Sequence, residues 1–207
     1  EMVDTALLQE GVVGVVFGTR PDCLSKGVLD YWRELSTQTF VSVELGVQSF
    51  EERHLVFMKR GHTAEKSMEA IHRVKNEAGI DLGIHLMFGW PEETIAEIVR
   101  SAELCSALPI DNVKLHNVHV LKNTELEKYY LEGRFTPVTL ESYAEMVGVF
   151  LQNLRADIAI HRLGAVASRW DELVAPEWAS YKMRTSQFVI DQMNQRGAEQ
   201  GDVFRER

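Results

Sequence analysis

The sequence predicts an α/β fold with a parallel β-sheet, an incomplete (β/α) part-barrel followed by a mainly helical C-terminal extension. Strand-like and helix-like segments alternate from residue 12 to residue 120, the strands carry one apolar and one polar face, and this rhythm changes after residue 121. Such alternation is typical of βαβ units whose strands run parallel. We therefore expect a partial barrel over residues 1–131 and an extension packed on it over residues 132–207.

Short, apolar and mostly β-branched runs predict the four strands. They cover residues 12–17, 40–48, 80–88 and 112–120. A further strand is expected over residues 157–163, within the extension.

Apolar stripes at helical spacing predict the helices between and after these strands. The predicted helices cover residues 28–35, 64–78, 95–102, 124–132, 140–154 and 183–195. Thr63 is the expected N-cap of the second helix, and Gly79 is the expected left-handed residue after it. The polar residues 196–207 are expected to fray.

The faces of the strands suggest a barrel with a polar interior. Successive side chains of a strand point to opposite faces, so Glu44, Lys114 and His116 fall opposite the apolar residues of their strands. A polar face enclosed by a curved sheet places a site at the carboxyl ends of the strands. Alternatively, these three residues form a salt-bridge network that only shapes the interior. Four strands cannot close a barrel, so we expect a half-barrel or a missing front part.

Composition limits the class of protein. The 207 residues carry 31 acidic and 22 basic side chains, a net charge of −9, which opposes a simple electrostatic nucleic-acid binder. No apolar run is long enough for a membrane span and no signal peptide opens the chain, so a cytoplasmic protein is expected. The two cysteines, Cys23 and Cys105, are too few for a disulfide scaffold or a zinc ribbon. We expect both to be small core residues.

Several segments at the predicted strand ends together resemble the radical S-adenosylmethionine (SAM) superfamily. The resemblance is closest to an uncharacterised bacterial branch near the elongator-type radical domain and the oxygen-independent coproporphyrinogen oxidases, and it covers nearly the whole chain. The segments that carry it are Gly18–Asp22, Glu44–Ser49, Lys59–His62, His85–Glu93, Lys114–His116, Ala159–Leu163, Leu173–Trp178 and Arg196–Gly201.

The resemblance implies a six-stranded part-barrel of which this chain holds strands three to six, the C-terminal two-thirds. The whole enzyme would use S-adenosylmethionine and a [4Fe–4S] cluster to generate a 5′-deoxyadenosyl radical and modify an unknown substrate. The family holds its cluster with three closely spaced cysteines, whereas this chain has two, 82 positions apart. We therefore expect the cluster ligands to be absent here, with no metal site in this chain, and the fragment to be inactive.

The same resemblance implies a set of cofactor-binding residues. In the resembled oxidases the position of Gln48 contacts the cofactor, and the position of Arg60 holds the methionine carboxylate, a pairing that suits a guanidinium. His85 stands where those enzymes carry an aspartate near the ribose, and Met87 and Val118 match positions that line the adenine. The alternatives are a strand-end cap for Gln48 and a solvated surface arginine for Arg60. For His85 the alternative is an interior histidine satisfied by a neighbour, and for Met87 and Val118 it is core packing.

Other polar residues at the same strand ends are candidates to face the substrate. They are Thr19, Arg20, Glu44, Lys114, His116, His161 and Arg162. Gly18 stands where some relatives carry a glutamate, so it supplies space there. Pro21 restricts Arg20 to an extended conformation. A less favoured alternative is that His85, His116 and His119 ligate zinc.

A second class of function stays open. The chain could be a binding module without redox chemistry, holding a nucleotide or RNA on a part-barrel scaffold. Relatives in the elongator branch act on transfer RNA, so transfer RNA is a possible partner by analogy.

Overall fold

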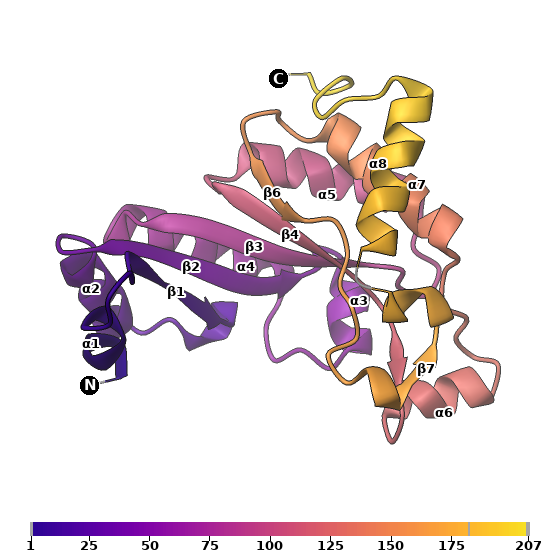
Figure 1. The fold of residues 1–207 in the computed structure, drawn as a ribbon, viewed down its shortest axis with the longest axis horizontal. Coiled ribbons are helices and arrows are strands. Elements are labelled where there is room, and N and C mark those ends of the chain that lie inside the picture. Colours follow the sequence, from indigo (N-terminus) through magenta and orange to yellow (C-terminus); the bar gives the residue numbers. More distant parts are fainter. Residues whose placement is uncertain (1, 182, 206–207) are drawn as a thin grey trace. The chain divides into compact units, whose positions relative to one another are not determined.

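The computed structural model describes residues 2–181 and 183–205 and forms an α/β fold around a five-stranded parallel sheet (Figure 1). The sheet order is β1-β2-β3-β4-β6, and the other two strands form a separate antiparallel pair. The strands are β1 (Gly14–Thr19), β2 (Phe40–Gln48), β3 (Asp81–Phe88), β4 (Asn112–Asn117), β5 (Val120–Leu121), β6 (Ala159–Arg162) and β7 (Leu173–Ala175). Within the described residues the sheet is open, as the prediction of a part-barrel requires.

Eight α-helices lie before, between and after the strands in the described part of the chain. They are α1 (Met2–Leu7), α2 (Lys26–Leu35), α3 (Glu52–Phe57), α4 (Ala64–Arg73), α5 (Ile95–Ala107), α6 (Glu125–Leu131), α7 (Leu140–Asn153) and α8 (Arg184–Arg196). Short 3-10 helices cover Pro21–Cys23, Trp170–Glu172 and Glu177–Ser180, and a π-helical turn covers Val74–Ala78. None of the described helices is long and apolar enough to cross a membrane.

The chain divides into two compact units. The first contains Glu1–His85 and Leu108–Asn112, and the second contains Leu86–Ala107 and Val113–Arg207. These two units are divided at other residues than the predicted domain boundary. The boundary after residue 131 stays a prediction.

In the first unit, β1 and β2 pair in parallel from Gly14 opposite Phe40 to Thr19 opposite Leu45. Phe17 stacks on Trp32 of α2 with ring centroids 5.4 Å apart, which fixes the helix against the strand. The apolar stripe of α2 explains this packing, because its buried residues recur at helical spacing.

In the second unit, α5 packs against α7, and α7 packs against α8 (Figure 1). Phe88 at the end of β3 contacts Phe150 of α7 edge to face, with centroids 5.3 Å apart. The hydroxyl of the buried Tyr143 donates a hydrogen bond to the carbonyl of Leu163, which ties α7 to the segment after β6.

The two faces of the strands differ as predicted. The residues on the apolar faces of β2, β3 and β4 are at most 3% exposed: Val41, Val43, Leu45, Val47, Leu82, Ile84, Leu86, Phe88, Val113 and Leu115. On the opposite faces Glu44, His85, Lys114 and His116 are half-buried. The helix caps are also confirmed, because Thr63 accepts a hydrogen bond from the Lys66 amide and Gly79 is left-handed with φ 66°.

Some elements differ from the prediction for local reasons. The first strand begins two residues later than predicted, because Val12 and Val13 are exposed and belong to the preceding turn. The strand predicted over residues 112–120 is two strands, and the six-residue helix α3 was missed.

The end of the chain also departs from the prediction. The predicted fraying does not occur up to residue 205, because the amides of Gly201 and Val203 bond to carbonyls at the end of α7. The side-chain amide of Gln200 adds two hydrogen bonds, to the carbonyls of Arg155 and Ile158.

Candidate cofactor site

The carboxyl ends of β1 and β2 form one edge of the first unit. Thr19 is the last residue of β1 and Gln48 is the last residue of β2. Because the two strands are parallel, both residues lie at the same edge of the sheet. Gln48 has a φ of 71°, a left-handed conformation that is unusual for a residue other than glycine. Gly18 has nothing within 4 Å of the place of a Cβ, which agrees with the prediction that it supplies space.

The turn after helix α3 brings Arg60 back to the carboxyl end of β2. Lys59 is left-handed with φ 55°, and the amide of Arg60 donates to the carbonyl of Leu55 at 2.9 Å, which ends the helix sharply. The Nη2 of Arg60 then donates to the carbonyl of Gly46 in β2 at 2.7 Å. The sequence thus folds back on itself to place Arg60 beside the end of β2.

Gly46 leaves room for two side chains of the site. A Cβ at this position would lie 3.0 Å from Arg60 Nη2 and 3.0 Å from Gln48 Nε2. Both side chains therefore converge on one glycine, and the structure brings together two of the residues predicted to bind the cofactor. We call Gly46, Gln48 and Arg60 the β2 cradle.

Arg60 is a half-buried cation whose hydrogen bonding is incomplete. Its Nε is buried and has no acceptor among the described residues, and the acceptor at Gly46 is a neutral carbonyl. Burial lowers the pKa of the guanidinium, and the positive charge of Arg20 lowers it further, while Asp22 opposes both. An anion arriving at this side chain would gain a charge-assisted hydrogen bond and offset the burial.

Arg20 and Asp22 form an ion pair beside the β2 cradle. Arg20 has the extended backbone that Pro21 predicts, with φ −97° and ψ 152°. Its Nε donates to Asp22 Oδ1 at 2.9 Å, and its Nη2 donates to Asp22 Oδ2. The hydrogen bond to Arg20 is the main cause of the lowered pKa of Asp22.

His62 lies beneath this ion pair. Its side chain is fully buried, and its Nδ1 is 3.6 Å from Asp22 Oδ1, beyond hydrogen-bond distance. Neither ring nitrogen has a hydrogen-bond partner in the described part of the chain. Burial and the charge of Arg60 lower the pKa of His62, so the imidazole is neutral near pH 7.

A second polar pair lies on the inner faces of β2 and β3. His85 Nε2 and Glu44 Oε2 are 2.9 Å apart, with side-chain exposures of 24% and 14%. Glu44 is thus partnered within the sheet by His85, a residue outside the alternative network of Glu44, Lys114 and His116.

The other predicted site residues belong to the second unit and are described there. Val118 is 3% exposed, and its amide donates to the carbonyl of Phe88 at 2.9 Å. The carbonyl of Met87 accepts a hydrogen bond from the indole of Trp90 at 2.7 Å. Lys114 and His116 are half-buried in β4, and His161 and Arg162 are exposed in β6. Within the first unit the structure therefore groups Thr19, Arg20, Gln48 and Arg60.

The cysteines do not fit a cluster site. Cys105 is buried in α5, as predicted, and burial strongly raises the pKa of its thiol. Cys23 is exposed, contrary to the prediction, because it ends a surface 3-10 helix. Among the described residues no three or more His, Cys, Asp or Glu side chains form a group that could hold a metal ion. Neither a [4Fe–4S] cluster nor the alternative zinc site therefore finds its ligands in this part of the chain.

Three residues of this region were missed as site residues at the sequence level: Asp22, Gly46 and His62. The Arg-x-Asp spacing of Arg20 and Asp22 was the available signal for an ion pair across the Pro21 turn. Gly46 and His62 lie within the recognised segments, but only the folded chain shows what they contact.

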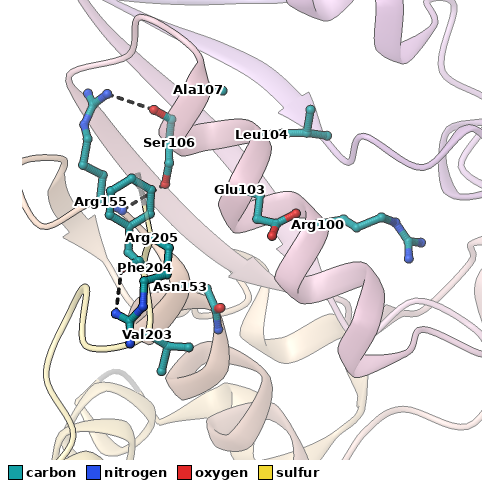
Figure 2. Close-up of a pocket in the computed structure, with 10 residues that line it drawn as sticks. All are labelled: Arg100, Glu103, Leu104, Ser106, Ala107, Asn153, Arg155, Val203, Phe204 and Arg205. Carbon is teal, nitrogen blue, oxygen red and sulfur yellow. Dashed lines mark hydrogen bonds between the residues drawn. The ribbon is translucent and has the colours of Figure 1, made fainter. Parts of the chain in front are cut away.

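The second unit has a cavity of about 610 Å³ of its own (Figure 2). It is lined by Arg100, Glu103, Leu104, Ser106, Ala107, Asn153, Arg155, Val203, Phe204 and Arg205. Arg155 is held on one side of it by the Ser106 carbonyl at 2.8 Å and by the carboxylate of Asp157. Arg100 lies 4.0 Å from a carboxylate oxygen of Glu97. Two of the arginines that line the cavity, Arg155 and Arg100, thus lie near carboxylates of the same unit.

The open five-stranded parallel sheet, with helices between its strands, is an incomplete (β/α) barrel. Two family models match the chain: "Radical SAM superfamily" over residues 3–105 and "Radical_SAM C-terminal domain" over residues 110–195. The chain belongs to the radical SAM superfamily.

Individual relatives agree with this assignment. The chain is 32% identical to an uncharacterised protein of Methanocaldococcus jannaschii over 99% of its own length and 63% of that protein. It is 31% identical to the tRNA uridine(34) acetyltransferase of Methanocaldococcus infernus over 65% of this chain and 25% of that protein. The structure of Methanocaldococcus infernus Elp3 with an N-terminal deletion superposes with a TM-score of 0.78 at 25% identity, covering 91% of this chain and 43% of that one. The chain thus spans less than two-thirds of the length of these relatives.

Proposed function

We propose that this chain forms the S-adenosylmethionine-holding part of a radical SAM enzyme, with the β2 cradle binding the methionine end of the cofactor. The observation that carries the proposal is the half-buried guanidinium of Arg60, whose Nε has no acceptor among the described residues. A carboxylate is the anion that best matches the planar fork of an arginine.

The other predicted residues complete the proposed binding mode. Gln48 has an amide that can both donate to the cofactor and accept from it. The Glu44–His85 pair offers hydrogen-bonding atoms for the ribose hydroxyls, while Met87 and Val118 supply contacts for the adenine. Bound S-adenosylmethionine supplies the hydrogen-abstracting chemistry of the superfamily, and the chain's own residues bind and orient it.

The whole protein's activity is also a proposal. We infer that its cluster ligands lie outside these 207 residues, because Cys23 and Cys105 are far apart in sequence and Cys105 is buried. On this proposal the 207-residue chain alone has no activity. The substrate would approach the remaining candidates at the strand ends, which are Thr19, Arg20, Lys114, His116, His161 and Arg162.

Transfer RNA is the proposed substrate class. The support is the similarity to a protein named tRNA uridine(34) acetyltransferase, and the opposing observation is the net charge of −9. A gel shift of the whole protein with transfer RNA at 50 and 200 mM salt tests it. Absence of a shift at both salt concentrations would remove transfer RNA from the proposal.

The main test measures cofactor binding by the whole protein with Arg60 changed. Arg60→Ala should weaken S-adenosylmethionine binding by about 30- to 100-fold, because a charge-assisted bidentate contact is lost. Isothermal titration calorimetry gives the dissociation constants, and Arg196→Ala, at an exposed arginine ending α8, is the control. Equal affinities for Arg60→Ala and the control would refute the proposed carboxylate contact.

A cleavage assay separates the enzyme from the alternative binding module. The reconstituted, reduced whole protein should convert S-adenosylmethionine to 5′-deoxyadenosine. Tight binding without any cleavage would instead support a module that holds a nucleotide-like ligand without redox chemistry.

A further inference from the structure

We propose that Arg20 is a positioning residue that holds the Asp22 carboxylate away from Arg60, so that the Arg60 guanidinium stays available to the carboxylate of the cofactor. This inference rests on the proposed function. It assigns a role to Arg20 that acts through Asp22 and needs no contact between Arg20 and the cofactor.

The geometry places Asp22 next to the residue that follows Arg60. A Cβ on Gly61 would lie 3.6 Å from Asp22 Oδ2 and 3.7 Å from Arg20 Nη2. Asp22 Oδ1 is also 3.6 Å from the ring of His62. The ion pair therefore lies along the Arg60–His62 segment, and the charges of both of its members reach Arg60.

Arg20 occupies both oxygens of the Asp22 carboxylate. Its Nε bonds to Oδ1 at 2.9 Å and its Nη2 bonds to Oδ2, a two-point contact that fixes the direction of the carboxylate. With Arg20 absent, Asp22 would remain ionised and would have the guanidinium of Arg60 as a neighbouring cation. An internal carboxylate on Arg60 would then compete with the carboxylate of the ligand.

The exposure of the pair argues against a role in stability alone. The side chains of Arg20 and Asp22 are 51% and 23% exposed, and exposed ion pairs contribute little to folding. A pair that contributes little to folding, placed beside an arginine whose Nε lacks an acceptor, is better explained by its effect on that arginine.

The glycine between Arg60 and His62 fits this arrangement. Gly61 is exposed, and a Cβ on it would be in ordinary van der Waals contact with both members of the ion pair, which therefore lies close to the backbone beside Arg60. Asp22 is thereby near enough to influence Arg60, yet in the structure it bonds to Arg20.

The test is a charge cycle in the whole protein with two ligands. S-adenosylhomocysteine carries the α-amino and α-carboxylate groups of the methionine end and 5′-methylthioadenosine lacks both, so calorimetry with the two ligands isolates the contacts of that end. Arg20→Ala should weaken S-adenosylhomocysteine binding by about tenfold and leave 5′-methylthioadenosine unchanged, since an internal carboxylate competes only at Arg60. Adding Asp22→Asn to Arg20→Ala should restore affinity to within about threefold of the unchanged protein.

The outcomes distinguish the inference from its competitors. If the double variant binds S-adenosylhomocysteine as weakly as Arg20→Ala, Arg20 contacts the ligand itself or supports the site, and the inference is wrong. If Arg20→Ala has no effect, the inference is equally wrong. If Arg60→Ala leaves S-adenosylhomocysteine binding unchanged, it is the proposed function that fails.

A matched control variant removes an exposed arginine from a pair of the same spacing. Arg134 and Glu132 are two residues apart in the second unit, with Nη1 and Oε2 3.1 Å apart and both side chains more than half exposed. Arg134→Ala should leave both ligand affinities unchanged. Thermal unfolding of all variants checks that each one is folded before its affinity is interpreted.

Discussion

The guanidinium groups of Arg60 in the first unit and Arg155 in the second have different kinds of partner. Arg155 meets the carboxylate of Asp157 and the carbonyl of Ser106, so its charge is matched by its own unit. Arg60 meets a neutral carbonyl and keeps a buried Nε without an acceptor among the described residues. Whether an arginine at a cavity is available to bind a ligand therefore depends less on how many arginines line the cavity than on the partners that each guanidinium already has.

Enlarging Gly46 should perturb the β2 cradle directly. Gly46→Ala places a methyl group 3.0 Å from both Arg60 Nη2 and Gln48 Nε2, so both side chains must shift by a few tenths of an ångström. We expect S-adenosylhomocysteine binding to weaken by about tenfold in calorimetry with the whole protein. Gly27→Ala is the control, because Gly27 lies in α2, outside the β2 cradle, and the nearest atom to its added methyl group is 4.0 Å away. Equal effects of the two variants would contradict the role of Gly46.

Removing Arg155 should affect folding and leave binding unchanged. Arg155→Ala loses the hydrogen bond to the Ser106 carbonyl and the contact with Asp157, which should lower the free energy of unfolding by about 1–2 kcal/mol. Urea unfolding measures the loss, and calorimetry should show unchanged affinity for S-adenosylhomocysteine. A weakened affinity in a stably folded variant would show that the second unit's cavity takes part in cofactor binding.

The smallest expected effect is a pH dependence of stability that comes from His62. Burial and the charge of Arg60 place its folded-state pKa below the ordinary value of 6.5. Below pH 6.5 the unfolded chain binds a proton that the folded chain resists, so stability should fall as the pH decreases from 6.5 toward the folded pKa. The loss should be no more than about 1 kcal/mol per pH unit.

Urea unfolding between pH 7.5 and pH 5.5 compares the unchanged protein with His62→Gln, which cannot take up this proton. The variant should show a flatter dependence on pH in this range. The same slope in both proteins would show that other groups cause the pH dependence.

Regular patterns made much of the fold predictable. Strand β2 has the predicted bounds because its strict alternation fits a sheet with one buried face. Thr63 and Gly79 marked the ends of a helical segment because capping uses a local side chain and a left-handed backbone. Helix α3 was not predicted, because its six residues are too few to show a helical repeat.

The site was predictable only where it coincides with strand ends and recognised segments. Gln48 and Arg60 were each predicted as cofactor-binding residues, and the structure brings them to one glycine. The spacing of Arg20 and Asp22 allows their ion pair, whereas the burial of His62 near Asp22 depends on contacts between segments far apart in the sequence, which neither periodicity nor spacing reports.

Gln48 gives the β2 cradle an evolutionary constraint. A left-handed backbone at a residue with a Cβ costs about 1 kcal/mol, and glycine would remove that strain while deleting the amide. Selection for a more stable protein and selection for a working site therefore favour different residues at this one position. A glutamine retained at this position during evolution would indicate selection for ligand binding and not for stability.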